Sequence, residues 1–191
     1  MIKNRILTAC IATAAASVCA VSAQAQTEVP FSGPYVAAIG GWDRVDGDHH
    51  GETGFDYGGI VGYDVAAGSV RVGPEVELTG STAKGCVGTA ATEKCIRSGR
   101  DLFVGGRLGV VATSQVLAYV MAGYTNANFD RYAPGRDKDI LEKKAHSGAR
   151  IGVGVEYALS NAAFLKTEYR YSRYSHGVSR NQILGGIGIR F

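Results

Sequence analysis

The sequence predicts an all-β protein, an eight-stranded antiparallel up-and-down β-barrel that spans a membrane. Three observations support this fold class: eight segments have the length and composition of strands and most of them alternate between polar and apolar residues, the connections between them are alternately short and long, and only 19% of the residues are charged. Alternation with a period of two places successive side chains on opposite faces of a strand. Short turns at one end and long polar loops at the other are typical of outer-membrane barrels.

The composition excludes several other classes of protein. The 191 residues include 27 glycines but only 4 prolines, and 46% are hydrophobic, which fits neither a disordered chain nor a collagen-like one. The formal net charge of +3 is spread along the chain, so no basic stripe indicates a nucleic-acid partner. After the N-terminal region, no apolar stretch reaches the roughly 20 residues that a membrane helix requires.

The N-terminus has the pattern of a secretory signal peptide. Lys3 and Arg5 precede an apolar stretch over residues 6–21, and small residues around Ala25 provide a cleavage site. The expected organisation is a cleaved signal over 1–25, a short periplasmic segment over 26–33 and a barrel domain over 34–191.

A lipoprotein signal is the competing interpretation of the same region. Cys10 has almost no apolar region before it, and Cys19 follows Val18, which is a poor neighbour for a cleavage site that needs small residues. The cleaved signal is therefore the favoured prediction.

Cys86 and Cys95 are the two cysteines left after the predicted cleavage, and both lie in a polar stretch. In an exported chain, two nearby thiols indicate a loop-closing disulfide, because the compartment is oxidising. Free thiols, or thiols bound to a metal, remain the alternative, although two cysteines without a neighbouring histidine provide half a ligand set.

Eight segments show the strand pattern. The first two alternate less cleanly, because they are rich in glycine and alanine, and the fifth is apolar on both parities, so its facing stays unassigned. In chain order the segments cover residues 35–44, 53–66, 70–79, 101–110, 116–126, 150–157, 164–174 and 183–191.

The remaining five segments each have one charged face and one apolar face. The apolar faces carry mostly Val, Ile, Leu and Tyr. The charged faces carry Arg71, Glu75 and Glu77 in the third segment, Asp101 and Arg107 in the fourth, Arg150 and Glu156 in the sixth, Lys166, Glu168 and Arg170 in the seventh, and Arg190 in the eighth.

Periodicity alone does not say which face lies inside. A soluble β-sandwich or a lipocalin-like barrel would bury the apolar face and cover its outer face with charge. The low charged fraction favours the opposite arrangement, in which apolar residues face lipid. A sheet in lipid must close, because an open edge would leave backbone groups unsatisfied.

The predicted lumen therefore contains charged side chains. An eight-stranded barrel is just wide enough for side chains to fill, and an unpaired buried charge is costly. The charges should pair and plug the barrel, and a narrow conducting pore is the alternative. The expected lumen network comprises Arg71, Glu75, Glu77, Arg107, Arg150, Glu156, Lys166, Glu168, Arg170 and Arg190.

Taken together in order, several short motifs resemble those of the small opacity-type outer-membrane β-barrel proteins, also described as porin-like. They cover essentially the whole predicted mature chain. They are Gly33-Pro34-Tyr35-Val36, Gly58-Gly59-Ile60-Val61-Gly62-Tyr63, Val72-Gly73-Pro74-Glu75-Val76-Glu77, Gly106-Arg107-Leu108-Gly109, Ala118-Tyr119-Val120, Ala122-Gly123, Gly152-Val153-Gly154-Val155-Glu156-Tyr157, Lys166-Thr167-Glu168-Tyr169-Arg170-Tyr171 and Arg190-Phe191.

The resemblance implies a location and a set of partners. It implies an eight-stranded barrel in the outer membrane of a Gram-negative bacterium, in contact with lipid and lipopolysaccharide, and without the peptidoglycan-binding domain of larger relatives. Phe191 would be the terminal aromatic that the barrel-assembly machinery reads. The functions of family members range from envelope integrity to adhesion and to ligand capture through the loops. No cofactor is expected.

The sequence gives little support for an enzyme. Residues 173–177 vaguely resemble a motif of barrels that deacylate lipid A, but Arg173 stands where that family has its base, and His176 follows Ser175 instead of preceding it. A serine nucleophile needs a base within hydrogen-bond reach. His176 is therefore expected to be a solvated loop residue, and the protein is expected not to be an enzyme.

Two loops carry charge. The loop from Asp43 to Glu52 matches no EF-hand spacing, so a solvated acidic loop is expected, with a site for a divalent cation or for bridged lipopolysaccharide as the alternative. The loop from Asp130 to Lys144 mixes both signs and is expected at the surface, where adhesion contacts would lie. The first loop contains Asp43, Asp46, Asp48, His49, His50 and Glu52.

Overall fold

The computed structural model describes residues 30–46, 51–82, 84–87, 94–132, 140–175 and 178–191, and these contain nine β-strands. The signal peptide, most of the segment 26–33, Asp48 to His50 and His176 lie outside the described residues. The strands are β1 Gly33–Asp46, β2 Gly51–Ala67, β3 Val70–Ser81, β4 Lys84–Val87, β5 Lys94–Thr113, β6 Val116–Tyr132, β7 Ile140–Ala158, β8 Ala163–Tyr174 and β9 Ser179–Arg190.

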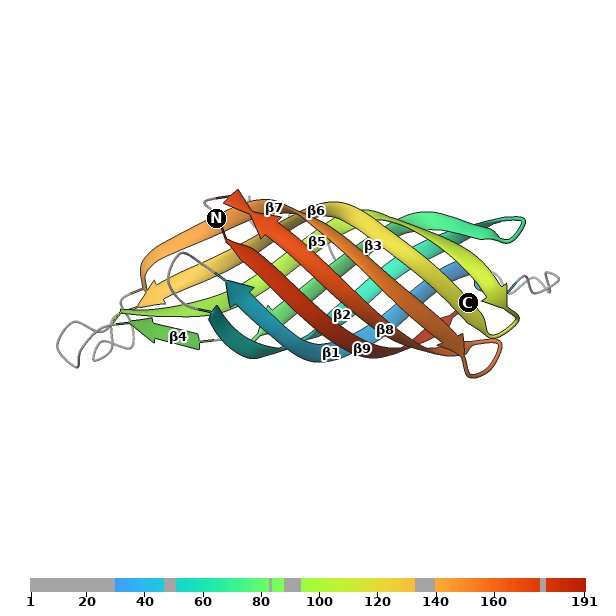
Figure 1. Ribbon diagram of the computed structural model, residues 1–191, viewed down its shortest axis with the longest axis horizontal. Helices are drawn as coiled ribbons and strands as arrows, with labels where there is room; N and C mark the ends of the chain where they lie inside the picture. Colours follow the sequence, from blue (N-terminus) through green and yellow to red (C-terminus); the bar gives the residue numbers. More distant parts are fainter. Residues whose placement is uncertain (1–29, 47–50, 83, 88–93, 133–139, 176–177) are drawn as a thin grey trace, which may run out of the picture.

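Eight of these strands form one closed antiparallel barrel, as predicted. Within the ring, each strand pairs with the next one along the chain, β3 pairing directly with β5. The pairing of β1 with β9 closes the ring. The ninth strand, β4, was not predicted; it pairs with β5 just beyond the closed ring. In Figure 1 it lies at the left end of the barrel, whereas the C-terminus lies near the right end, where short turns connect the strands.

The short turns have the expected positions. Gly68 and Ser69 connect β2 to β3, and Gly68 has a φ of +64°, a left-handed conformation that glycine adopts without a steric cost. The turns at Ser114 and Gln115 and at residues 159–162 lie at the same end.

The strands of the β5–β6–β7 side are longer than the sequence indicated. β5 has 20 residues and β7 has 19, because backbone pairing continues at the long-loop end after the apolar alternation has stopped. The alternation follows the environment of the side chains, whereas the ladder needs only backbone groups.

The apolar faces of the strands point outward and the charged faces point inward. In β8, buried and exposed residues alternate along the strand, with Glu168 buried and Tyr169 exposed. Many large apolar side chains are exposed, among them Val61 and Ile151 at about 60%. A water-soluble protein rarely exposes so much apolar surface. This arrangement is the one predicted for a barrel in lipid, and it excludes the soluble β-sandwich.

A polar border limits the apolar surface at the long-loop end. The Tyr124 hydroxyl donates to Ser147 Oγ at 2.6 Å, and the Tyr169 hydroxyl donates to Asn181 Oδ1 at 2.7 Å. Tyrosines commonly occupy such an interface, with the ring in lipid and the hydroxyl in the polar zone. The polar border consists of the outward polar residues that follow the apolar band towards the long loops. On seven strands, in order from β1 to β9, they are Arg44, Thr53, Arg100, Asn126, Ser147, Arg173 and Asn181.

The height of the apolar band can be estimated on β7. Its outward residues from Ala149 to Tyr157 span about 27 Å along the strand and, at a tilt of roughly 40°, about 20 Å along the barrel axis. This height suits an outer membrane. Within the described ranges, the chain has no helix long and apolar enough to cross a bilayer.

Candidate functional site

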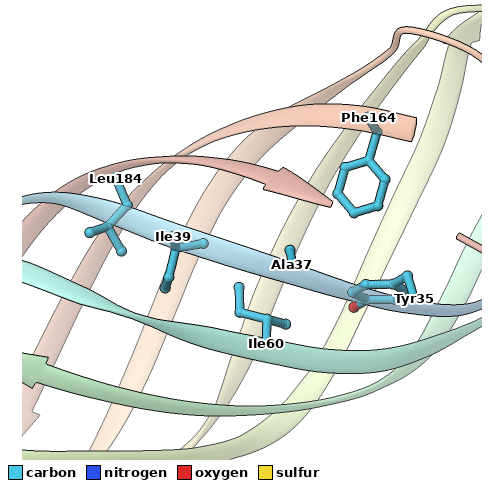
Figure 2. Close-up of a cluster of buried hydrophobic side chains, with 6 residues drawn as sticks. All are labelled: Tyr35, Ala37, Ile39, Ile60, Phe164 and Leu184. Atoms are coloured by element: carbon cyan, nitrogen blue, oxygen red, sulfur yellow. The ribbon is translucent and has the colours of Figure 1, made fainter. Parts of the chain in front are cut away.

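The lumen has one mainly apolar wall. Figure 2 shows a cluster of buried side chains that lie on the inner side of the sheet on neighbouring strands. Small residues beside them make room for larger ones: a Cβ at Gly62 would collide with the Tyr35 ring, which occupies that space. The cluster consists of Tyr35, Ala37 and Ile39 on β1, Ile60 on β2, Phe164 on β8 and Leu184 on β9.

At the short-turn end, two arginines alternate with two carboxylates. Arg107 donates to both oxygens of Asp64, at 2.9 and 2.5 Å, and to Glu156 at 2.6 Å. Arg190 donates to the same two carboxylates, at 2.8 and 2.9 Å. The guanidinium carbons of Arg107 and Arg190 lie 4.5 and 4.8 Å from the centre of the Tyr35 ring. The four charges form a closed ring across the lumen.

Glu168 and Glu77 organise the middle of the lumen. Glu168 pairs with Arg170 and, at 3.1 Å, with Lys166, and it accepts a hydrogen bond of 2.5 Å from the Tyr119 hydroxyl. Glu77 accepts from Arg170 at 2.5 Å. These contacts join β3, β6 and β8 through the interior, so side chains fill the centre of the barrel.

A third cluster lies towards the long loops. Asp43 accepts two hydrogen bonds from Arg180, at 2.9 and 2.6 Å. Asp101 accepts from Arg180 at 3.1 Å, from the Tyr174 hydroxyl at 2.9 Å, and from Arg150. Arg150 also donates to Glu77 at 3.0 Å, which connects this cluster with the middle of the lumen. Further hydrogen bonds come from Ser81 to Asp43, from Thr125 to Asp101 and from Gln182 to Asp56.

Buried charges of both signs are nearly balanced in the described lumen. This balance fits the large desolvation cost of a charge, which only close partners of opposite sign offset. The carboxylates are Asp43, Asp56, Asp64, Glu75, Glu77, Asp101, Glu156 and Glu168, and the cations are Arg71, Arg107, Arg150, Lys166, Arg170, Arg180 and Arg190.

The structure places all ten residues of the expected lumen network inside the barrel, and nine of them make ion pairs. For Arg71, the contacts within the described residues are with backbone carbonyls. Its guanidinium donates to the backbone carbonyls of Pro30, Gly68 and Val70 at 2.8 to 2.9 Å. Arg71 lies at the short-turn mouth, where carbonyls of the turn and of the N-terminal segment are the nearest acceptors.

Asp43 corrects an expectation, because it does not belong to a solvated loop. It lies on β1, is 1% exposed and pairs with Arg180. Asp46 at the end of β1 is exposed and pairs with Arg44 at 3.0 Å. Among the residues whose side chains are described, no group of three or more His, Cys, Asp or Glu is arranged to hold a metal ion.

Sequence reasoning missed several lumen residues. Asp56 and Asp64 lie on β2, whose glycines and alanines blur the alternation, and Arg180 lies in a part of β9 that had been assigned to a loop. Asp56 and Asp64 lie within the predicted segment 53–66 and share one parity, so following that parity would have found them; for Arg180, the parity of the segment 183–191 must be extended by three residues. Tyr35, Tyr119, Tyr174 and Gln182 are further buried lumen residues, with hydrogen bonds to carboxylates.

The strand with unassigned facing, β6, also has a definite orientation. Tyr119 and Met121 point into the lumen, whereas Val120 and Tyr124 point outward. Both faces are largely apolar because the inward side chains pack against the charge network and the outward side chains contact lipid.

Residues 173–175, the described part of the segment that vaguely resembles a deacylase motif, face two different environments. Tyr174 points into the lumen and bonds Asp101, whereas Arg173 and Ser175 are exposed at the rim. His176 lies outside the described residues.

The pairing of β4 with β5 places the two cysteines directly opposite each other in the backbone register. Cys86 on β4 is the direct cross-strand partner of Cys95 on β5. Adjacent antiparallel strands hold such partners at a Cα separation of about 4.5 to 5.5 Å, which is within the range that a disulfide spans. The disulfide itself stays a prediction.

Comparison with known proteins gives consistent results. The family model of the outer membrane protein beta-barrel domain matches residues 11–191. The 31 kDa outer-membrane immunogenic proteins of Brucella melitensis and Brucella suis are 28% identical over 156 residues, which is 73% of this chain and 65% of theirs. The matched part therefore spans less than two thirds of the length of these relatives.

Solved structures share the fold. Neisserial surface protein A matches with a TM-score of 0.62 at 18% identity, covering 84% of this chain and 98% of that protein. Ail, the attachment invasion locus protein of Yersinia pestis, matches with a TM-score of 0.58 at 16% identity, over 84% and 100% of the two chains. OprG of Pseudomonas aeruginosa has a TM-score of 0.54 at 12% identity, over 87% and 99%.

Proposed function

This chain belongs to the outer membrane protein β-barrel domain family and is an outer-membrane protein of a Gram-negative bacterium, and we propose that it acts as a closed barrel with a structural or surface-interaction role. In this proposal the lumen does not conduct, no substrate is turned over, and the useful surfaces are the lipid-facing band and the parts beyond it.

The charge network in the lumen carries the proposal. Paired side chains fill the interior at three levels, and Arg150 bridges two of them. A conducting pore needs a continuous aqueous path with sites that an ion can enter and leave. Here six of the seven described lumen cations, all but Arg71, lie at hydrogen-bond distance from carboxylates, so a passing ion would have to break buried pairs.

The rim supports an interaction role over an enzymatic one. Catalysis by a serine requires a base beside the nucleophile, and the sequence has Arg173 at the position where the deacylase family has its base. The strands that extend past the polar border instead offer surface on the outer side of the membrane.

The test is a planar-bilayer measurement on the refolded full barrel, and we expect no reproducible ion-selective steps. The double variant Arg150→Ala with Arg170→Ala removes two guanidiniums from the interior and should produce small steps, which shows that a pore would be detected. Trp42 is the single tryptophan, is 68% exposed on the outer surface, and reports insertion of each variant through its fluorescence. Steady conductance by the unaltered barrel would contradict the proposal.

A matched control and a second measurement complete the design. The pair Thr167→Ala with Val153→Ala changes two outward residues of the same strands and should leave the bilayer silent. Lipid A from cells that express the protein should be chemically unaltered, and a deacylated product would overturn the proposal that the barrel is not an enzyme.

A further inference from the structure

The buried charges of the lumen do not cancel completely. Among the described residues, eight buried carboxylates face seven cations, so the interior carries one surplus negative charge. The ring at the short-turn end is balanced, because Arg107 and Arg190 pair with Asp64 and Glu156 there. The surplus therefore lies deeper in the lumen or towards the long loops. A buried charge without a counterion is costly, which calls for a further positive charge.

Asp56 on β2 is poorly supplied with positive charge. Its ion pair is with Arg180, whose Nη2 lies 3.4 Å from Asp56 Oδ1. The same guanidinium pairs with Asp43 at 2.6 Å and with Asp101 at 3.1 Å. Asp56 therefore shares this single positive charge with two other carboxylates, both of which lie closer to it.

Several buried oxygen atoms of the lumen have no hydrogen-bond partner within the described part of the chain. They include Asp56 Oδ1, Glu77 Oε2, Thr79 Oγ1 and Gln182 Oε1. These residues are at most 3% exposed, so bulk water does not reach them. Buried polar atoms normally have a partner, and an unpartnered set indicates a bound ion or ordered water.

The strand register brings these four residues together. Gln182 donates its side-chain N–H to the other oxygen of Asp56. Thr79 on β3 is the cross-strand partner of Gly58, the next lumen-facing residue after Asp56 on β2. A Cβ at Gly58 would lie 2.6 Å from Thr79 Cγ2, so the threonine side chain lies against the glycine. Glu77 is the next lumen-facing residue of β3 and acts on Asp56 electrostatically.

Two glycines flank Asp56 on the inner face of the sheet. Its direct partner on β1 is Gly41, which faces the lumen. Gly58 follows it on the same face of β2. Neither has a side chain that could occupy the space beside the carboxylate, so a small ion can approach Asp56 from these two sides.

We propose that the lumen binds one hard monovalent cation, such as Na⁺, between Asp56 and Glu77, with the oxygens of Thr79 and Gln182 as neutral ligands. Hard cations bind through carboxylate and amide oxygens. One positive charge makes the described lumen neutral, which a water molecule alone does not do. Calcium takes about six to eight oxygen ligands, more than the unpartnered atoms of this site supply. The inference goes beyond the proposed function and does not depend on the surface role.

The test is urea-induced unfolding of the refolded full barrel in vesicles of a zwitterionic lipid, in sodium chloride or choline chloride of equal ionic strength. Choline has the same charge but is too large to enter between these side chains. We expect sodium, and not choline, to shift the unfolding midpoint to higher urea. The equilibrium constant for folding should rise about tenfold when the sodium concentration is about nine times the dissociation constant.

Variants identify the site. Asp56→Asn removes one negative charge but keeps an oxygen that can accept from Gln182, and it should make stability independent of sodium. Asp64→Asn is the matched control: Asp64 belongs to the balanced ring, so this variant should lose stability but keep the sodium response. Thr79→Val removes one neutral ligand and should raise the sodium concentration for half of the effect about tenfold. Heat-modifiable gel mobility shows that each variant is folded, and if Asp56→Asn does not fold, Thr79→Val carries the test.

Other outcomes overturn the inference. Equal stability in sodium and choline at every concentration would show that the lumen binds no such ion. Uptake of one proton on folding, measured as a pH dependence that Asp56→Asn abolishes, would show that a proton neutralises the lumen instead. Either result would leave a silent, closed barrel intact, whereas steady conductance in the planar bilayer would contradict the proposed function and leave the cation site standing.

Discussion

Arg107 illustrates how a single residue is held in this lumen. It is 2% exposed and meets two carboxylates and the faces of two tyrosine rings, Tyr35 and Tyr119. Each partner is shared, since Asp64 and Glu156 also bind Arg190. Removing one member of such a set leaves an uncompensated charge in the interior. The resulting loss of stability is larger than the net stabilisation that the ion pair provides.

Glu168→Ala is the corresponding prediction at the residue scale. It removes the acceptor for Lys166, Arg170 and Tyr119, and should lower the free energy of unfolding by about 3–5 kcal/mol without opening a pore. The measurement is urea-induced unfolding of the barrel in vesicles. Thr167→Ala changes the adjacent outward residue and should shift stability by less than about 0.5 kcal/mol; equal losses for the two variants would refute the role of the network.

The sequence was a good guide to lumen residues wherever alternation was clean. The parity of Lys166, Glu168 and Arg170 is fixed by tyrosines on the other face, so their inward position could be predicted. Asp43 was grouped with loop carboxylates because it stands next to them in the chain, although the parity of β1 puts it on the buried face of Tyr35. Its partner Arg180 is far away in sequence and could not be predicted. Pairings across the lumen depend on the closed ring, which local patterns do not encode.

At the scale of elements, the sequence predicted the eight barrel strands but not their full lengths. The apolar alternation of β7 ends near Ala149, where lipid ends, while the backbone ladder continues to Ile140. β4 went unnoticed because four residues in a polar stretch have no periodicity to detect.

The β4–β5 hairpin leads to a prediction about its cysteines. Because Cys86 and Cys95 are cross-strand partners, protein purified without reductant should contain a disulfide between them. Reduction should leave heat-modifiable mobility unchanged, since the closed ring does not include β4, and should make the hairpin more sensitive to protease added outside the cell. Cys86→Ser with Cys95→Ser should behave like the reduced protein. Two free thiols found by mass spectrometry would contradict this pairing.

At the scale of the whole molecule, the barrel is a ring closed between its first and last strands. β1 pairs with β9 over its length, and the N–H of Phe191 donates to the Pro34 carbonyl at 2.9 Å. The Phe191 side chain is 74% exposed, so it contributes little to packing within the barrel. Its exposure leaves the aromatic ring accessible to another protein, as the expected role in assembly requires.

Deletion of Phe191 separates these contributions. We expect fewer folded barrels in the outer-membrane fraction, measured as the heat-modifiable band on a gel, because a closed barrel resists detergent until boiled. Phe191→Tyr keeps both the backbone and an aromatic ring and should assemble normally. Unchanged assembly after the deletion would remove Phe191 from any recognition signal.

The pairing of Asp43 with Arg180 joins residues 137 positions apart, and the β1–β9 seam has similarly distant partners. Contacts so remote in sequence make folding slow, because a long loop must close before they form. The seam also cannot form until the last strand has been exported, so the chain must cross the periplasm with its lipid-facing residues uncovered. We therefore expect a newly exported chain to stay soluble only with the help of a chaperone, until β9 has arrived and the seam can close.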